Sequence, residues 1–120
     1  GMAGVETRLP LMYSEGVAAG RISLERFACV WAEGPARAFG LYPRKGVLAV
    51  GSDADLVVFD PNAHWTLRAA DLHMNTDCLA YEGRSVTGKA VATVLRGNLL
   101  VRAGEWLSAY IGGELVHRRL

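Results

Sequence analysis

The spacing of apolar residues changes near Pro43, and this change constrains the fold more than any other feature. Before Pro43, apolar residues recur at the three- and four-residue intervals of helices, whereas after Gly46 glycines separate short β-type runs. We therefore expect residues 8–40 to be mostly helical and residues 46–107 to be mostly strand and turn. Helices followed by strands predict an α+β fold, or two pieces of different domains.

Two helices and a short third one are predicted before Pro43. The first carries apolar residues at helical spacing and stops at Gly20. Ser23 is predicted to cap the second, after which Gly34-Pro35 breaks the pattern and restarts it as a short helix that Gly40 ends. The expected apolar faces are Leu9, Met12, Tyr13, Gly16 and Val17 in the first helix, and Leu24, Phe27, Ala28 and Trp31 in the second.

Short strands are predicted after Gly46. Residues 56–59 should form a buried strand that a turn at Asp60-Pro61-Asn62 closes, and residues 65–67 a second short strand. Residues 90–95 and 99–102 should pair as a hairpin through a turn at Arg96-Gly97-Asn98. We also expect residues 105–107 to extend the sheet. Residues 68–85 hold few apolar side chains and predict a long loop.

Composition excludes several classes of protein. A chain of 120 residues, 51% hydrophobic and 21% charged, is typical of one small globular domain. The net charge of +1 argues against nucleic acid as a partner. The basic cluster His117-Arg118-Arg119 predicts a solvated tail in preference to a binding patch. Apolar runs are too short to span a membrane, and a signal-peptide apolar region is not expected.

Metal-ligating residue types are present, but their spacing is unfavourable. The three histidines, His64, His73 and His117, form neither H-x-H nor H-E-x-x-H. Asp53 and Asp55 lack the further ligands of an EF-hand. We therefore interpret Asp53-Ala54-Asp55 as a strand-entry device, with the Asp55 carboxylate partly buried and bonded to a nearby backbone N–H or an arginine such as Arg96.

Candidate nucleophiles lack recognisable partners. G-x-S-x-G is absent, and the serines 14, 23, 52, 85 and 108 belong to no known triad pattern. Cys29 is expected to face the core and Cys78 to be the more reactive thiol in the polar loop. Two cysteines outside any C-x-x-C motif favour reduced thiols in the cytoplasm. Gly112-Gly113 is only a weak turn signal.

Nearly the whole chain resembles part of a known enzyme family. The runs GVETRLPLMYSEGVAAGRISLERF, FGLYPRKGVLAVGSDADLVVFDP and YEGRSVTGKAVATVLRGNLLVRAGEW are similar to the C-terminal part of the cyclic amidohydrolases. These include hydantoinases, dihydropyrimidinases, allantoinases and dihydroorotases, and the segment GVETRLPLMYSEGV favours hydantoinases or dihydropyrimidinases over dihydroorotases. The run GPARAFGLYPRKG differs from the family's pattern at Gly34, where asparagine is usual.

This resemblance implies a hydrolase whose (β/α)8 barrel binds two divalent metal ions, typically zinc, beside a composite β-sandwich. The resemblance implies helices of the barrel end in residues 1–43, sandwich strands in residues 44–107 and a tail in residues 108–120. The family's metal ligands, an H-x-H pair, a carboxylated lysine, two more histidines and an aspartate, fall upstream of the matched segment. The resemblance therefore assigns no catalytic, substrate-binding or metal-binding residue, and no cofactor, to this chain.

Three hypotheses follow. The chain is a C-terminal fragment of a hydantoinase-like hydrolase, inactive alone and structural in role. Alternatively, it is a free-standing interaction module, or a subunit that completes a barrel in trans. A small metalloenzyme using His64, His73 and Asp77 is the weakest hypothesis. We also expect a homodimer or higher homo-oligomer, with neither nucleic acid nor membrane as a partner.

Overall fold

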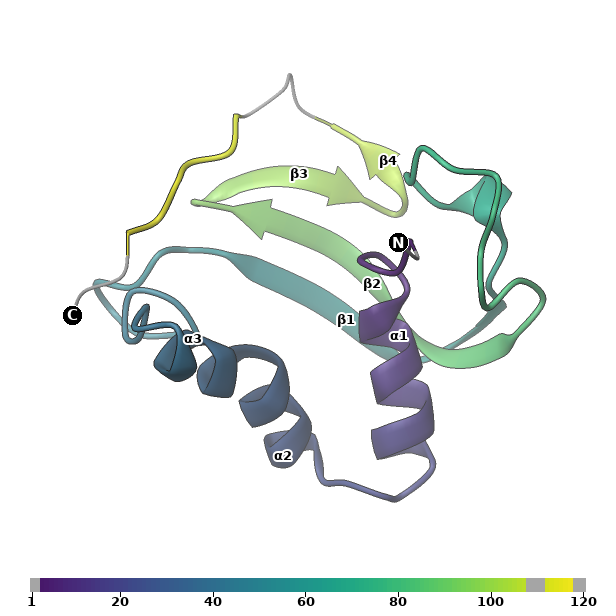
Figure 1. The fold of residues 1–120 in the computed structure, drawn as a ribbon, viewed down its shortest axis with the longest axis horizontal. Coiled ribbons are helices and arrows are strands. Elements are labelled where there is room, and N and C mark those ends of the chain that lie inside the picture. The colour runs from purple at the N-terminus through teal and green to yellow at the C-terminus, as the bar shows by residue number, and fades with distance from the viewer. Residues whose placement is uncertain (1–2, 108–111, 118–120) are drawn as a thin grey trace. The chain divides into compact units, whose positions relative to one another are not determined.

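The computed structural model describes residues 3–107 and 112–117. They form two compact units, each built from two stretches of the chain. The first unit comprises residues 1–23 and 60–89, and the second comprises residues 24–59 and 90–120. The N-terminal third is helical and the remainder is mainly strand and turn, as the periodicity predicts (Figure 1).

In the first unit, helix α1 (Arg8–Met12) continues into the π-helical segment η1 (Tyr13–Ala18). Gly20 adopts a positive φ of 70°, and its N–H donates to the Val17 carbonyl, so the helix ends where the glycine predicts. All five predicted apolar positions of this helix are buried or half-buried. Leu11, outside that predicted face, also packs against the core.

In the second unit, helix α2 (Leu24–Ala28), the π-helical segment η2 (Cys29–Glu33) and helix α3 (Gly34–Ala38) follow without interruption. The predicted break at Gly34-Pro35 is therefore wrong. The Gly34 N–H donates to the Cys29 carbonyl, and a Cβ on Gly34 would lie 3.0 Å from that oxygen. A residue without a Cβ thus suits the wide π-helical turn that ends at Gly34, and Pro35 follows directly in the first turn of α3.

The second predicted helix buries fewer of its apolar side chains than expected. Phe27 is buried and stacks on Trp31, but Leu24 is 58% exposed. Helix α3 ends at Ala38, and Gly40, the predicted terminator, follows in the closing turn with a φ of 67°. A Cβ on Gly46, whose φ is 84°, would lie 2.5 Å from the Cβ of Ala36 in α3. Only glycine therefore allows the chain to pass α3 at this point.

The sheet has four antiparallel strands in the order β1-β2-β3-β4 (Figure 1). They are β1 (Leu56–Thr66), β2 (Ser85–Leu95), β3 (Asn98–Arg102) and β4 (Glu105–Trp106). The predicted turn at Asp60-Pro61-Asn62 is wrong, because β1 runs through it. β1 lies at the end of the strand order, where a proline without an N–H is tolerated, and the Asp60 carboxylate accepts the Asn62 N–H at 2.9 Å.

The predicted hairpin is confirmed. Arg96 and Gly97 both have positive φ angles, 47° and 79°, so a two-residue turn of type I′ joins β2 to β3. Leu95 pairs with Asn98 directly beside the turn. Ala103 and Gly104 form a second turn with positive φ angles, which confirms the predicted extension of the sheet by β4.

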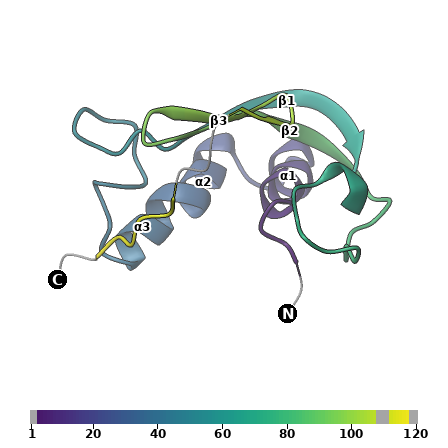
Figure 2. The same ribbon diagram turned by 90° about the horizontal axis from the view of Figure 1, so that it is seen from above.

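The core of the first unit is built on Leu67, Leu79 and Val86. Helix α1 lies along one face of β1 and β2 in this unit (Figure 2). Residues 67–84 form a loop with one short 3₁₀ turn (Ala69–Asp71), close to the predicted loop. Its Leu79 is nevertheless only 7% exposed, so the loop supplies core as well as surface. Within the described residues, no helix is long and apolar enough to cross a membrane.

Candidate functional site

Asp53-Ala54-Asp55 lies in the second unit, directly before β1. The segment is held by its backbone: the Asp53 N–H donates to the Arg44 carbonyl at 2.9 Å, and the Gly97 N–H donates to the Ala54 carbonyl at 3.0 Å. The segment is thereby joined both to the chain that follows α3 and to the turn between β2 and β3.

Both carboxylates of this segment form ion pairs with basic side chains. Lys45 Nζ lies 2.7 Å from Asp53 Oδ2 and also bonds to Asp55 Oδ2. Arg44 Nε donates to Asp53 Oδ2 at 2.9 Å. The second Asp55 oxygen, Oδ1, accepts the backbone N–H of Arg96 at 2.8 Å. The predicted bond between Asp55 and Arg96 is therefore confirmed, although it uses the backbone of Arg96 and not its guanidinium.

The pKa values shift in the direction that these contacts require. Hydrogen bonding to Lys45 is the largest influence on the pKa of Asp53 and lowers it; burial opposes this, and the hydrogen bond to Arg44 adds to the lowering, so the net shift is downward. Burial raises the pKa of Asp55, but Lys45 and the Arg96 N–H together outweigh it, so the net shift is downward. Burial lowers the pKa of Lys45, and the two carboxylates more than reverse this. Both aspartates are therefore ionised and already paired with cations, as the strand-entry interpretation expects.

The spacing of residues in the sequence did not indicate which basic side chains pair with Asp53 and Asp55. Lys45 was not among the candidate residues, although it bridges Asp53 and Asp55 with a side chain only 22% exposed. The available signal was the pair Arg44-Lys45, which lies eight to eleven residues before the two aspartates, a distance that one compact loop can close.

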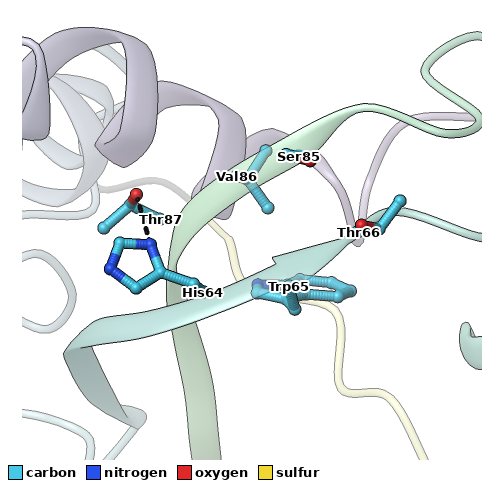
Figure 3. Close-up of a pocket in the computed structure, with 6 residues that line it drawn as sticks. All are labelled: His64, Trp65, Thr66, Ser85, Val86 and Thr87. Atoms are coloured by element: carbon cyan, nitrogen blue, oxygen red, sulfur yellow. Dashed lines mark hydrogen bonds between the residues drawn. The ribbon is translucent and has the colours of Figure 1, made fainter.

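A shallow hollow in the first unit, with a volume of about 280 Å³, holds the second candidate group. It is lined by His64, Trp65, Thr66, Ser85, Val86 and Thr87 (Figure 3). The imidazole Nδ1 of His64 lies 3.1 Å from the hydroxyl oxygen of Thr87, and the indole N–H of Trp65 donates to the Gly88 carbonyl at 3.0 Å.

This hollow does not assemble a recognisable catalytic set from its lining residues. Figure 3 shows the His64 ring directed toward Thr87, away from the Trp65 side chain. Thr87 is itself held through its backbone N–H, which donates to Ser14 Oγ at 3.1 Å. His64 in β1 is thus a hydrogen-bonded residue whose ring contacts Thr87 of β2.

His73 and Asp77 have surroundings of their own. Glu6 binds His73 twice, through the ring Nδ1 and the backbone N–H, both at 2.8 Å. Asp77 lines another shallow hollow with Cys78 and Glu82. Among the residues that the structure describes, no three His, Cys, Asp or Glu side chains are close enough together to hold a metal ion. The hypothetical set of His64, His73 and Asp77 is therefore not assembled.

The remaining candidates are ordinary surface or structural groups. Ser52 Oγ donates to the Pro43 carbonyl at 2.7 Å, and Ser85 lines the His64 hollow. Cys29 is half-buried, and Cys78 is exposed, as expected for the more reactive thiol. Ser108 and two members of the basic cluster, Arg118 and Arg119, lie outside the described residues.

Comparison with known proteins identifies the family. The sequence pattern of the Amidohydrolase family matches residues 16–101. The chain belongs to the amidohydrolase family. It is 41% identical to a D-hydantoinase of Ralstonia pickettii over 119 residues, which are 99% of this chain and 26% of that protein. An L-hydantoinase of Paenarthrobacter aurescens is 42% identical over the same share of each chain.

Solved structures agree with this amidohydrolase assignment. The L-hydantoinase (dihydropyrimidinase) from Arthrobacter aurescens matches with a TM-score of 0.85 and 42% identity, over 90% of this chain and 24% of that one. The D-hydantoinase (dihydropyrimidinase) from Thermus sp. gives a TM-score of 0.84 at 40% identity, over 88% and 23%. The resemblance to hydantoinases is thus confirmed. This chain spans about a quarter of the length of the relatives that it matches.

Proposed function

We propose that this chain is a structural segment of a hydantoinase- or dihydropyrimidinase-type hydrolase, an enzyme that opens cyclic amides. One observation carries the proposal: 99% of the chain aligns with D-hydantoinase at 41% identity, over only 26% of that protein. In this proposal, residues 1–43 belong to the end of the barrel and residues 44–107 to the composite sandwich, within the C-terminal part of such an enzyme. Two free cysteines favour the cytoplasm as its location.

The residues of this chain do not fit the metal centre that the family resemblance implies. The sequence has three histidines and no H-x-H pair, and Asp53 and Asp55 are neutralised by Arg44 and Lys45. A bridged metal hydroxide requires several such ligands around two ions. We therefore assign the metal ions and the hydrolytic step to residues outside this chain, and a supporting role to the chain itself.

The test is hydrolysis by the purified chain. Hydantoin and dihydrouracil should remain unopened with or without added Zn²⁺, while a full-length hydantoinase assayed in parallel opens them. Metal-dependent ring opening well above the blank would contradict the proposal. If that activity then disappeared in His73→Ala but not in His117→Ala, the small metalloenzyme hypothesis would replace it.

A second candidate function is an interaction module, such as a subunit that completes a barrel in trans. The autonomous pairing of Asp53, Asp55 and Lys45 favours it, because the segment before β1 needs no partner to neutralise its charges. A reading frame directly upstream that encodes H-x-H and the barrel would support this version. Co-expression of that frame with this chain should then restore ring opening, whereas an isolated gene would favour a repurposed module.

Self-association is also proposed. Several apolar side chains on strands of the second unit are exposed: Val57 is 47% exposed, Val58 53% and Trp106 55%. β1 and β4 lie at the two ends of the described strand order, and a strand edge is a template for pairing with another chain. We expect a homodimer, the commonest symmetric assembly. Light scattering at micromolar concentration tests this, and a sharp monomer mass would contradict it.

A further inference from the structure

Residues 112–117, here called the strap, run past the turn between β2 and β3 in the second unit (Figure 1). The strap is joined to that turn by Arg96. One guanidinium nitrogen of Arg96 donates to the Gly112 carbonyl at 3.0 Å, and the other lies 3.3 Å from Glu114 Oε2. One side chain on the turn thus grips both the backbone and a carboxylate of the strap.

A second cation reaches the same carboxylate. Arg44 Nη2 lies 3.6 Å from Glu114 Oε1, while its Nε is bonded to Asp53. Glu114 therefore lies between two arginines that come from different parts of the unit. Its interaction also contributes to the raised pKa of Arg44, although the hydrogen bond to Asp53 is the main cause.

The strap also forms part of a hollow. A cavity of about 300 Å³ is lined on one side by Tyr42, Pro43, Arg44 and Asp53, and on the other by Val116 and His117 of the strap. If the strap moved away from the rest of the second unit, this hollow would lose the wall formed by Val116 and His117, and Glu114 would lose its contacts with the two guanidinium groups.

Apolar packing does not account for the position of the strap. Leu115 is 79% exposed, and only Val116 among the six strap residues is half-buried. The strap is held by charged and polar contacts, and the side chains that make them are accessible: Glu114 is 55% exposed, Arg44 44% and Arg96 30%. Contacts of this kind weaken when salt screens them.

From this arrangement we infer that the strap is an ionic latch, which Glu114 closes on Arg44 and Arg96 at low salt and which opens as ionic strength rises. Arg96 is suited to the role because its backbone N–H is fixed by Asp55, so the base of its side chain is held in place. The latch connects the C-terminal segment to the same carboxylate pair that anchors the entry to β1.

Order parameters of backbone amides in the full chain test the latch. At 50 mM NaCl, amides 113–117 should be nearly as rigid as those of β3, with values about 0.8, and Glu114→Gln should lower them below about 0.6. Glu105→Gln, which removes a carboxylate from exposed β4, is the matched control and should leave the strap rigid. Arg96→Lys keeps the charge but loses the two-pronged donor, so it should also loosen the strap.

A salt series separates an ionic latch from other causes of rigidity. At 1 M NaCl the Debye length falls to about 3 Å, so the wild-type strap should loosen toward the Glu114→Gln values. Apolar contacts do not weaken in this way, and the variant itself should respond little to salt. A wild-type strap that is already flexible at 50 mM NaCl, or a strap that stays rigid in Glu114→Gln, would overturn the inference.

Discussion

Asp55→Ala tests the structural role of the Asp53-Ala54-Asp55 segment most directly. The substitution removes the acceptor of the Arg96 N–H, which lies 2.8 Å away, and one of the two partners of Lys45. Arg96 itself has a positive φ of 47°, a backbone conformation that is unfavourable for residues other than glycine.

The magnitude follows from the exposure of the two bonds. A hydrogen bond to a charged group contributes about 1.5–3 kcal/mol when shielded, and the Asp55 side chain is 30% exposed, so about 1–2 kcal/mol applies here. The ion pair with Lys45 adds about 0.5–1 kcal/mol. Asp55→Ala should therefore lower the free energy of unfolding by about 2 kcal/mol. Asp55→Asn, which keeps an acceptor but not the charge, should cost about half as much.

Urea denaturation followed by circular dichroism measures these differences at one dilute protein concentration. The exposed Asp77 provides the control, because Asp77→Ala should stay within about 0.5 kcal/mol of wild type. A value for Asp55→Ala no larger than that of Asp77→Ala would refute the reasoning. The strand-entry interpretation of the segment would then fail with it.

Three further predictions concern pH, glycine and thiol chemistry. The folded pKa of Asp55 lies below the ordinary aspartate value of 3.8, so its stabilisation is present above that pH and is lost as the pH falls through the folded pKa. Acid titration of unfolding should show this loss in wild type and a smaller one in Asp55→Ala. Gly46→Ala should destabilise the fold by about 2–4 kcal/mol, because the added Cβ clashes at 2.5 Å at a position that also has a positive φ. Gly51→Ala, where φ is also positive but the surrounding space is open, should cost about 1–2 kcal/mol. Thermal unfolding compares the two variants, and equal losses of stability would contradict the clash. Cys78 is exposed and Cys29 half-buried, so a thiol reagent should show a fast phase that Cys78→Ser removes, and an unchanged fast phase would be the contrary result.

Features with local causes could be predicted from the sequence. The turn at Arg96-Gly97 follows from a glycine between two apolar runs, and the helix ends at Gly20 and Gly40 follow from the same property of glycine. The bond from Asp55 to the Arg96 N–H was predictable in kind, because aspartates beside strands commonly accept nearby backbone N–H groups.

Features that depend on distant partners could not be predicted in the same way. Pro61 indicates a turn until one knows that β1 lies at the end of the strand order, where its missing N–H has no cost. Gly34-Pro35 indicates a helix break until the π-helical turn before it is known. The contact between Arg96 and Glu114 joins residues 18 apart, with strands β3 and β4 between them in the chain, and no sequence period encodes it.

The interleaved connectivity of the two units has a consequence for how this chain can be divided and synthesised. Each unit needs one stretch from before residue 60 and one from after it, so any single backbone cut between residues 23 and 90 separates parts of both units or of one. At a translation rate of about 5–20 residues per second, the helix of the first unit is synthesised several seconds before residues 60–89, on which that unit depends. The second unit is completed later still, because it needs residues beyond 89. Split-protein reporters or truncations that break the chain in this interval should therefore yield halves that regain structure only when both are mixed.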